Sequence, residues 1–139
     1  MTKEDKDLLL KDLCARVPYG VVVNISYNKE NGSSDRLRLC SEGDLPLNAD
    51  LLNLFIEQEI FLKPYLRPMS SMTEEERKYI IDECCIHETI LPGGISHALM
   101  PALAAKILIN FYNKKHLDFN GLIQNGLAIE VTEDNNPYL

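Results

Sequence analysis

The stretch GVVVNISYNKENGSSDRLRLCS, residues 20–41, predicts a β-hairpin. Residues 20–27 are mostly β-branched or aromatic, which favours a strand. Residues 36–41 alternate arginine and leucine, so the two arginines lie on one face of a second strand and the leucines on the other. The polar residues 28–35 form the connecting loop. We expect a small antiparallel sheet built on this hairpin.

One helix is predicted before the hairpin and another after it. Residues 2–16 predict a helix that begins at Thr2 and has one apolar face, which consists of Leu9, Leu10, Leu13, Cys14 and Val17. Asn48 or Asp50 caps a second, shorter helix. Residues 59–63 fit either the end of that helix or a strand. We favour the strand, because Pro64 pushes the residue before it toward extended geometry.

Two longer helices are predicted in the C-terminal half. Thr73 and Glu76 have the spacing of a capping box, so a helix runs from Glu74 to about His87. Its buried positions are expected to include Tyr79, Ile80, Ile81 and Cys84. The next helix starts near Leu99 and runs to about Lys115, with Leu103, Ile107 and Phe111 as its core line.

These elements together predict a single α+β domain over residues 1–139. The N-terminal helix packs beside the sheet, and the two C-terminal helices cover one face of it. Residues 127–132 form a final short strand, and the tail 133–139 is frayed. The composition agrees with an ordinary globular protein, since 45% of the residues are hydrophobic and 25% are charged.

The charge balance excludes some classes of partner. The chain has 14 basic and 21 acidic residues, a net charge of −7, and residues 48–90 alone carry −5 (4 basic, 9 acidic). Nucleic-acid affinity comes mainly from basic side chains that neutralise phosphates, and the sequence has no basic cluster larger than a pair such as Lys114–Lys115. We therefore expect no binding to nucleic acid and none to an anionic membrane.

The N-terminus and the cysteines indicate the compartment. Residues 1–10 lack the apolar core of a secretory signal, so we expect a cytoplasmic protein with no membrane anchor. Its four cysteines are then expected to be free thiols.

Three motifs carry chemically active residue types, and each has a structural explanation. Cys84-Cys85-Ile86-His87 lacks the paired ligand spacing of zinc sites. Gly93-Gly94-Ile95-Ser96 lacks the lysine and the spacing of a phosphate-binding loop. The run Glu74 to Glu76 fits a helix cap better than a catalytic pair. We therefore predict no catalytic residue, no metal and no cofactor.

The segment around Pro64 gives the one candidate site for a partner. In extended geometry Lys63, Tyr65 and Arg67 project to one side and Leu66 to the other. An exposed strip of tyrosine and arginine has the composition of binding hot spots. The alternative is an edge strand with Leu66 as its core anchor.

Three stretches together resemble an uncharacterised family of small proteins carried by gut Bacteroidetes and their prophages. They are residues 7–21 (DLLLKDLCARVPYGV), 63–76 (KPYLRPMSSMTEEE) and 118–128 (DFNGLIQNGLA). The resemblance implies a bacterial cytoplasm and a mobile genetic element as the context, and it implies no activity.

The sequence favours a non-enzymatic accessory protein that binds a protein partner through the Lys63 to Arg67 strip. One alternative is a small-molecule-binding protein or enzyme with a pocket between the hairpin and the long C-terminal helix. A nucleic-acid-associated factor is a further alternative, disfavoured by the net charge. The oligomeric state stays open.

Overall fold

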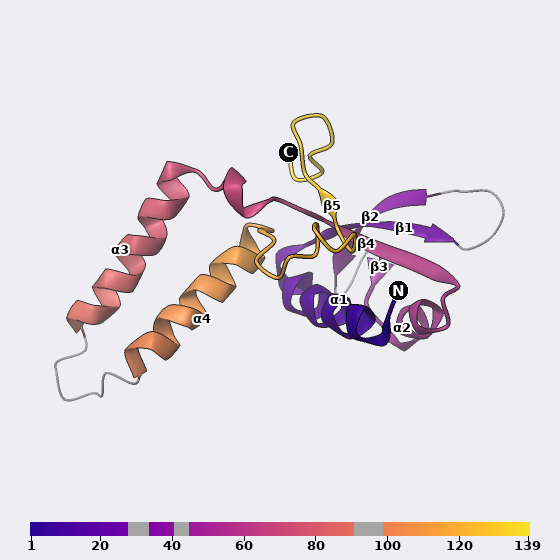
Figure 1. Ribbon diagram of the computed structural model, residues 1–139, viewed down its shortest axis with the longest axis horizontal. Helices are drawn as coiled ribbons and strands as arrows, with labels where there is room; N and C mark the ends of the chain where they lie inside the picture. The colour runs from indigo at the N-terminus through magenta and orange to yellow at the C-terminus, as the bar shows by residue number, and fades with distance from the viewer. Residues whose placement is uncertain (28–33, 41–44, 91–98) are drawn as a thin grey trace.

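The computed structural model describes residues 1–27, 34–40, 45–90 and 99–139 and shows an α+β fold (Figure 1). The elements, in chain order, are α1 (Lys3–Arg16), the 3-10 turn η1 (Val17–Tyr19), β1 (Val22–Tyr27), β2 (Ser34–Cys40), β3 (Leu45–Pro46), α2 (Ala49–Ile56), β4 (Ile60–Leu66), the 3-10 turn η2 (Met69–Ser71), α3 (Glu74–Ile90), α4 (Leu99–Lys114) and β5 (Ile129–Glu130).

The predicted hairpin is the centre of a five-stranded sheet with the order β3-β2-β1-β4-β5. β1 pairs antiparallel with β2, Val23 opposite Leu37, and antiparallel with β4, Ile25 opposite Leu62. β4 covers the segment that fitted either a helix or a strand, so the strand prediction is confirmed. The expectation of a wholly antiparallel sheet is wrong at both edges, because β3 and β5 pair in parallel. Each has only two residues, too few to leave an alternating pattern in the sequence.

The predicted helix starts are confirmed. Thr2 and Asp5 form a reciprocal capping box at the start of α1, with both hydrogen bonds 3.1 Å long. Thr73 and Glu76 do the same for α3, at 3.1 and 3.0 Å. Asn48 caps α2 by accepting a hydrogen bond from the Leu51 amide. These short-range contacts satisfy amides that the first turn leaves unpaired.

The core lies between one face of the sheet and the two helices α1 and α2. Leu9 and Leu13 of α1 and Phe55 of α2 are fully or almost fully buried against this face. The strand residues of the core alternate along β1, β2 and β4, and they include Val23, Ile25, Leu39, Leu62 and Leu66. The buried stripe of α1 also contains Asp12 and Arg16, whereas Cys14, predicted on the apolar face, is exposed.

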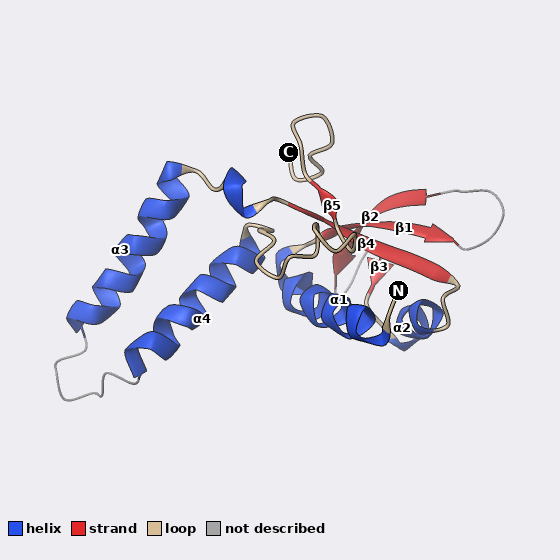
Figure 2. Cartoon of the chain, in the orientation of Figure 1, coloured by secondary structure: helices blue, strands red, loops and turns tan. Residues whose placement is uncertain are grey.

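The C-terminal helices are arranged differently from the prediction. α3 and α4 lie side by side and extend away from the sheet instead of covering one of its faces (Figure 2). Tyr79 and Ile81, predicted to be buried in α3, are 51% and 60% exposed. The apolar pattern of α3 predicts a helix that packs, but it does not say how many neighbours the helix has. None of the helices in the described ranges is both long and apolar enough to span a membrane.

Candidate functional site

The face of the sheet opposite α1 and α2 carries a group of polar and basic side chains. Strand register places three residues from each of β1, β2 and β4 on it. In rows across the sheet they are Ser34, Ser26 and Phe61, then Arg36, Asn24 and Lys63, then Arg38, Val22 and Tyr65. We call these nine positions the open sheet face.

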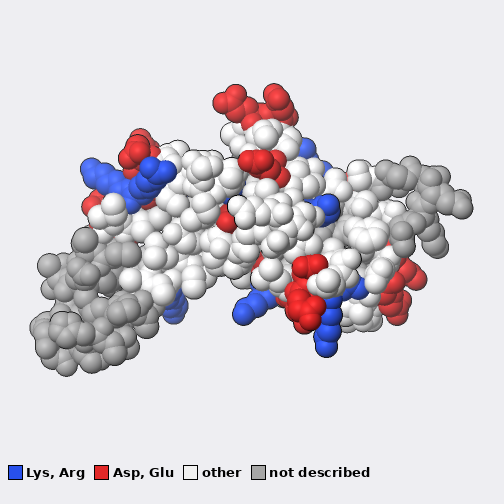
Figure 3. All heavy atoms as spheres, in the orientation of Figure 1, with Lys and Arg blue, Asp and Glu red and all other residues white. Residues whose placement is uncertain are grey.

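The open sheet face is basic in an acidic protein. Arg36, Arg38 and Lys63 are exposed, and none of the nine positions holds an acidic residue. Exposed acidic side chains gather over the C-terminal tail at the top of Figure 3. This tail contains Glu133 and Asp134 and lies on the side of the sheet away from α1 and α2 (Figure 1). The net charge of −7 therefore hides a local cationic patch.

The structure separates the three residues of the predicted strip. Lys63 is exposed, but Tyr65 is only 6% exposed, so the expectation of an exposed tyrosine strip is wrong. The Arg36 guanidinium lies over the Tyr65 ring, 4.8 Å from its centroid, as a cation–π pair. Alternation along β4 places Lys63 and Tyr65 on one face, but it does not reveal that an arginine from another strand covers the ring.

Arg67 is held by the start of α3. Its Nη2 donates to Glu76 Oε1 at 2.7 Å and its Nη1 to Glu76 Oε2 at 3.0 Å. The Arg67 hydrogen bond is the main reason that the Glu76 pKa falls from 4.5 to about 2, against the opposing effect of burial. Arg67 also donates to the Ser71 carbonyl. Its role in the structure is to fix α3 to the end of β4.

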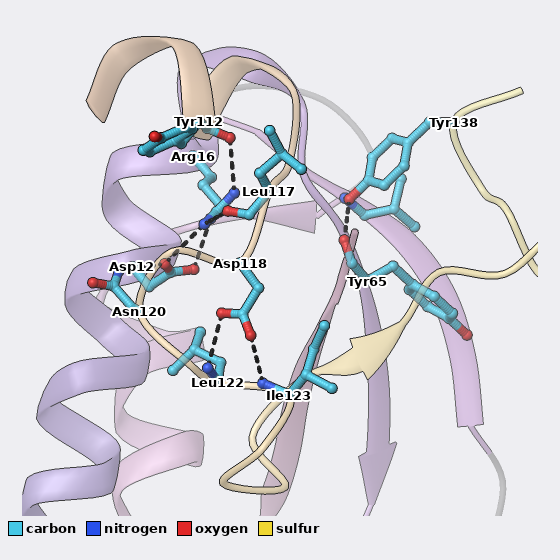
Figure 4. A network of polar contacts seen from close by, with 11 residues as sticks. Asp12, Arg16, Tyr65, Tyr112, Leu117, Asp118, Asn120, Leu122, Ile123 and Tyr138 are labelled. Carbon is cyan, nitrogen blue, oxygen red and sulfur yellow. Dashed lines mark hydrogen bonds and ion pairs between the residues drawn. The ribbon is translucent and has the colours of Figure 1, made fainter. Parts of the chain in front are cut away.

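The C-terminal tail closes the end of the sheet, contrary to the prediction that it is frayed. The Tyr138 hydroxyl accepts a hydrogen bond from the Val22 amide at 3.1 Å and donates one to the Tyr65 carbonyl at 2.7 Å (Figure 4). It thus bridges β1 and β4 just beyond their last paired residues, Val23 and Pro64. Burial raises the pKa of Tyr138 to about 12, so the hydroxyl keeps its proton.

His116 lies under the tail and holds its aromatic ring. The His116 and Tyr138 rings stack with centroids 3.9 Å apart and planes 7° apart. Burial lowers the pKa of His116 from 6.5 to about 4, and Arg16, Arg38 and Arg67 lower it further. The imidazole is therefore neutral near pH 7. Its backbone carbonyl accepts a hydrogen bond from the Arg67 amide at 2.7 Å, which ties the end of α4 to β4.

A buried ion pair connects α1 to the segment after α4. Arg16 and Asp12 have fully buried side chains, and the Arg16 Nη2 also donates to the Leu117 carbonyl at 2.7 Å (Figure 4). Asn120 donates to the Asp12 carboxylate at 2.9 Å. This network was not expected from the sequence, although the i, i+4 spacing of Asp12 and Arg16 within the leucine stripe was a usable signal.

Asp118 organises the turn that follows. Its two carboxylate oxygens accept hydrogen bonds from the amides of Leu122 and Ile123, at 2.8 and 2.9 Å. The buried carboxylates Asp12 and Asp118 are thus both engaged with fixed donors, as expected for groups that hold a fold together.

A groove of about 490 Å³ lies between α3 and α4. Its walls include Glu75 and Glu83 on α3, Lys114 at the end of α4 and Lys115 just after it. This is not the place where the sequence predicted a pocket, between the hairpin and the last helix. Tyr79 and Phe111 stack in the groove, with ring centroids 5.4 Å apart.

The other motifs of the sequence analysis give no further site. Cys84, Cys85 and His87 lie in α3, in the part whose side chains the structure does not describe, and residues 93–96 lie outside the described residues. Among the described residues, no group of three or more histidine, cysteine or acidic side chains is placed to hold a metal ion.

Comparison of the chain with protein-family models, with curated proteins and with solved structures finds no match. The resemblance to small proteins of Bacteroidetes and their prophages stays a prediction.

Proposed function

We propose that the protein is a non-enzymatic interaction protein that binds an acidic segment of a partner protein on its open sheet face. The observation that carries the proposal is the arrangement of Arg36, Arg38 and Lys63, three exposed cations with no acidic residue among the nine positions of that face. Such a local excess in a chain of net charge −7 favours an acidic partner at this one surface.

The spacing of the three cations fits an extended acidic peptide. Arg36 and Arg38 are two residues apart on one strand, a rise of about 7 Å. Alternate side chains of an extended peptide have the same spacing, so two carboxylates of one strand can meet the two guanidinium groups. Arginine suits this role because its planar fork binds a carboxylate through two hydrogen bonds. Lys63 lies two strands away from Arg36, about 10 Å across the sheet, where it meets a third carboxylate.

A single-stranded nucleic acid fits the same face less well. Proteins that bind single strands combine basic grooves with exposed aromatic rings on which bases stack. The Tyr65 ring is instead covered by Arg36, and Phe61 is half-buried. Three cations also provide only a small counterion-release term.

The cellular compartment and the origin of the protein are proposed from the sequence alone. The resemblance to proteins of gut Bacteroidetes and their prophages supports a bacterial cytoplasm and a mobile-element origin. We propose this setting for the interaction without assigning the partner a name.

Fluorescence anisotropy with a labelled peptide of alternating glutamate and threonine tests the proposal. The wild-type chain should bind this peptide, and a Lys-Thr peptide of the same length should not bind. The triple variant Arg36→Glu, Arg38→Glu and Lys63→Glu should weaken binding about a thousandfold, since each of the three lost charge-assisted contacts is worth about 1.5 kcal/mol.

The matched control places the same charge change elsewhere. Lys3, Lys11 and Lys78 are all exposed and lie on helices, so their simultaneous change to glutamate leaves the open sheet face intact. This control should bind the acidic peptide within about threefold of the wild type. Equal losses in both triple variants would contradict the proposal, and so would tighter binding of an oligo-dT of equal charge.

A further inference from the structure

In the described part of the α3–α4 hairpin, Phe111 is the one apolar side chain that is buried. From Glu74 to Glu83 of α3, and from Leu103 to Asn110 of α4, every side chain is either half-buried or exposed. Isolated helices of this length are marginal in water, and helices in proteins gain most of their stability by packing an apolar face. The stability of these two helices therefore depends on what covers them.

The composition of α4 is that of a helix buried on most of its surface. Eleven of its sixteen residues are hydrophobic, and Lys106 is its only charged residue before Lys114. A helix that is apolar on most of its circumference is normally buried on most of it. Ile109 is nevertheless 45% exposed, and Ile81 of the neighbouring helix is 60% exposed.

The charges of the two helices are complementary. α3 carries six acidic and two basic residues, whereas α4 carries two lysines and no acidic residue. The groove between them shows the same division, with Glu75 and Glu83 on the α3 wall and Lys114 and Lys115 on the α4 side. Any molecule that covers the whole face must present a basic surface to α3 and an acidic surface to α4.

We propose that a second copy of this chain covers the α3–α4 hairpin, with α3 of each copy against α4 of the other. A second copy has both required surfaces, because its own α3 is acidic and its own α4 is basic. A two-fold axis repeats every contact, so each favourable charge pair is made twice. The product is a four-helix bundle in which Tyr79, Ile107 and Phe111 of both copies form the centre. The dimer surface on α3 and α4 is separate from the open sheet face.

Light scattering coupled to size exclusion is the first test. At about 100 μM and low ionic strength the wild-type chain should have twice the 15.8 kDa chain mass, and the dimer should dissociate on dilution. The variant Glu75→Lys with Glu83→Lys should raise the dimer dissociation constant at least about tenfold, since like charges then face each other. Lys114→Glu with Lys115→Glu should do the same.

Mixing the two charge-reversed variants is the decisive step. The reversed charges of each variant repel a second copy of the same variant, but they are complementary to the charges of the other variant. The mixture should therefore form a heterodimer, measured by native mass spectrometry. Two control variants make the same charge reversals at other exposed positions and should dimerise like the wild type. They are Glu57→Lys with Glu59→Lys, and Lys3→Glu with Lys11→Glu.

Three results would overturn the proposal. One is a wild-type chain that stays monomeric at about 100 μM, a concentration at which even a modest dimer forms. Another is a dimer that none of the charge reversals at the groove weakens. The last is a mixture of the two reversed variants that stays monomeric while circular dichroism shows both to be folded, which would mean that α3 and α4 do not face each other across the interface.

Discussion

Asp12 and Arg16 form a two-hydrogen-bond ion pair with no exposure to solvent, at 2.8 and 3.2 Å. The guanidinium has a second set of contacts on the far side, the carbonyls of Tyr112 and Leu117, which close the C-terminal end of α4. One arginine therefore compensates a buried carboxylate of α1 and also satisfies backbone carbonyls about a hundred residues later. This pair connects α1, which covers the sheet, to the C-terminal end of α4.

Removing one partner of this pair should be costly. Arg16→Met should lower the free energy of unfolding by about 3–5 kcal/mol, because the Asp12 carboxylate stays buried with Asn120 as its remaining side-chain partner. Denaturation in urea measures the loss. The double variant Asp12→Leu with Arg16→Met should lose less than the sum of the two single variants, since no uncompensated charge remains. Additive losses would mean that the two charges do not stabilise each other.

The hydroxyl of Tyr138 should contribute to the free energy of unfolding, although Tyr138 is near the C-terminus. Tyr138→Phe keeps the ring on His116 but removes both hydrogen bonds, and it leaves the Val22 amide and the Tyr65 carbonyl without this partner. We expect a loss of about 1–3 kcal/mol in the free energy of unfolding. Tyr27→Phe is the matched control, because Tyr27 is largely exposed, and its effect should be close to zero. Equal effects of the two changes would contradict the bridging role.

The pKa of His116 predicts a pH window for stability. The folded pKa is about 4 and the ordinary value is 6.5, so the unfolded chain takes up a proton first as the pH falls. The stability contribution of the neutral imidazole is complete above about pH 6.5, decreases as the pH falls toward 4 and is constant below that. A difference of 2.5 pKa units corresponds to about 3 kcal/mol. Urea denaturation at a series of pH values measures the decrease.

His116→Asn isolates this contribution from the carboxylates. His116 has a positive φ of 57°, and asparagine tolerates that conformation without titrating. The variant should be less stable than the wild type at pH 7, and the gap between the two should narrow as the pH falls from 6.5 to 4. Glu76, with a pKa of about 2, acts mainly at lower pH and is common to both proteins. A gap that does not change with pH would contradict the assignment to His116.

The parts of the fold that depend on neighbouring residues could be predicted from the sequence. The alternation in residues 36–41 and the spacing of Thr73 and Glu76 each describe contacts within a few residues, and both are confirmed. The direction of the α3–α4 hairpin could not be predicted, because periodicity shows that Tyr79 lies on an apolar face but not what covers that face. The docking of Tyr138 depends on a partner strand more than 70 residues away.

The candidate site was predicted only in part, for the same reason. The sequence analysis placed Arg36 and Arg38 on one face of a strand and Lys63 on one side of another. Only the register of β1 between β2 and β4 shows that the three share a surface. Arg67 belongs to the same alternating series as Lys63, yet its guanidinium is held by Glu76 across the start of α3. A charge pattern within one strand therefore cannot separate a binding residue from a structural one.

Gly20 offers a test that connects the backbone to the open sheet face. It has a positive φ of 68°, and a Cβ atom added there would lie 2.9 Å from Nη1 of Arg38. Gly121 has a similar φ of 73°, but nothing lies within 4 Å of an added Cβ. Alanine at either position should cost about 1 kcal/mol in the free energy of unfolding, since L-residues pay for the left-handed conformation.

The two alanine variants should differ in binding. The atoms that a Cβ of residue 20 would meet belong to the flexible end of Arg38, so the guanidinium should move rather than the backbone. Gly20→Ala should therefore weaken binding of the acidic Glu-Thr peptide about tenfold, the equivalent of one displaced arginine contact, whereas Gly121→Ala should bind like the wild type. Anisotropy titrations of both variants, alongside urea denaturation, separate the two effects. Unchanged binding in Gly20→Ala would show that Arg38 does not contact the acidic partner, and the site would then be reduced to Arg36 and Lys63.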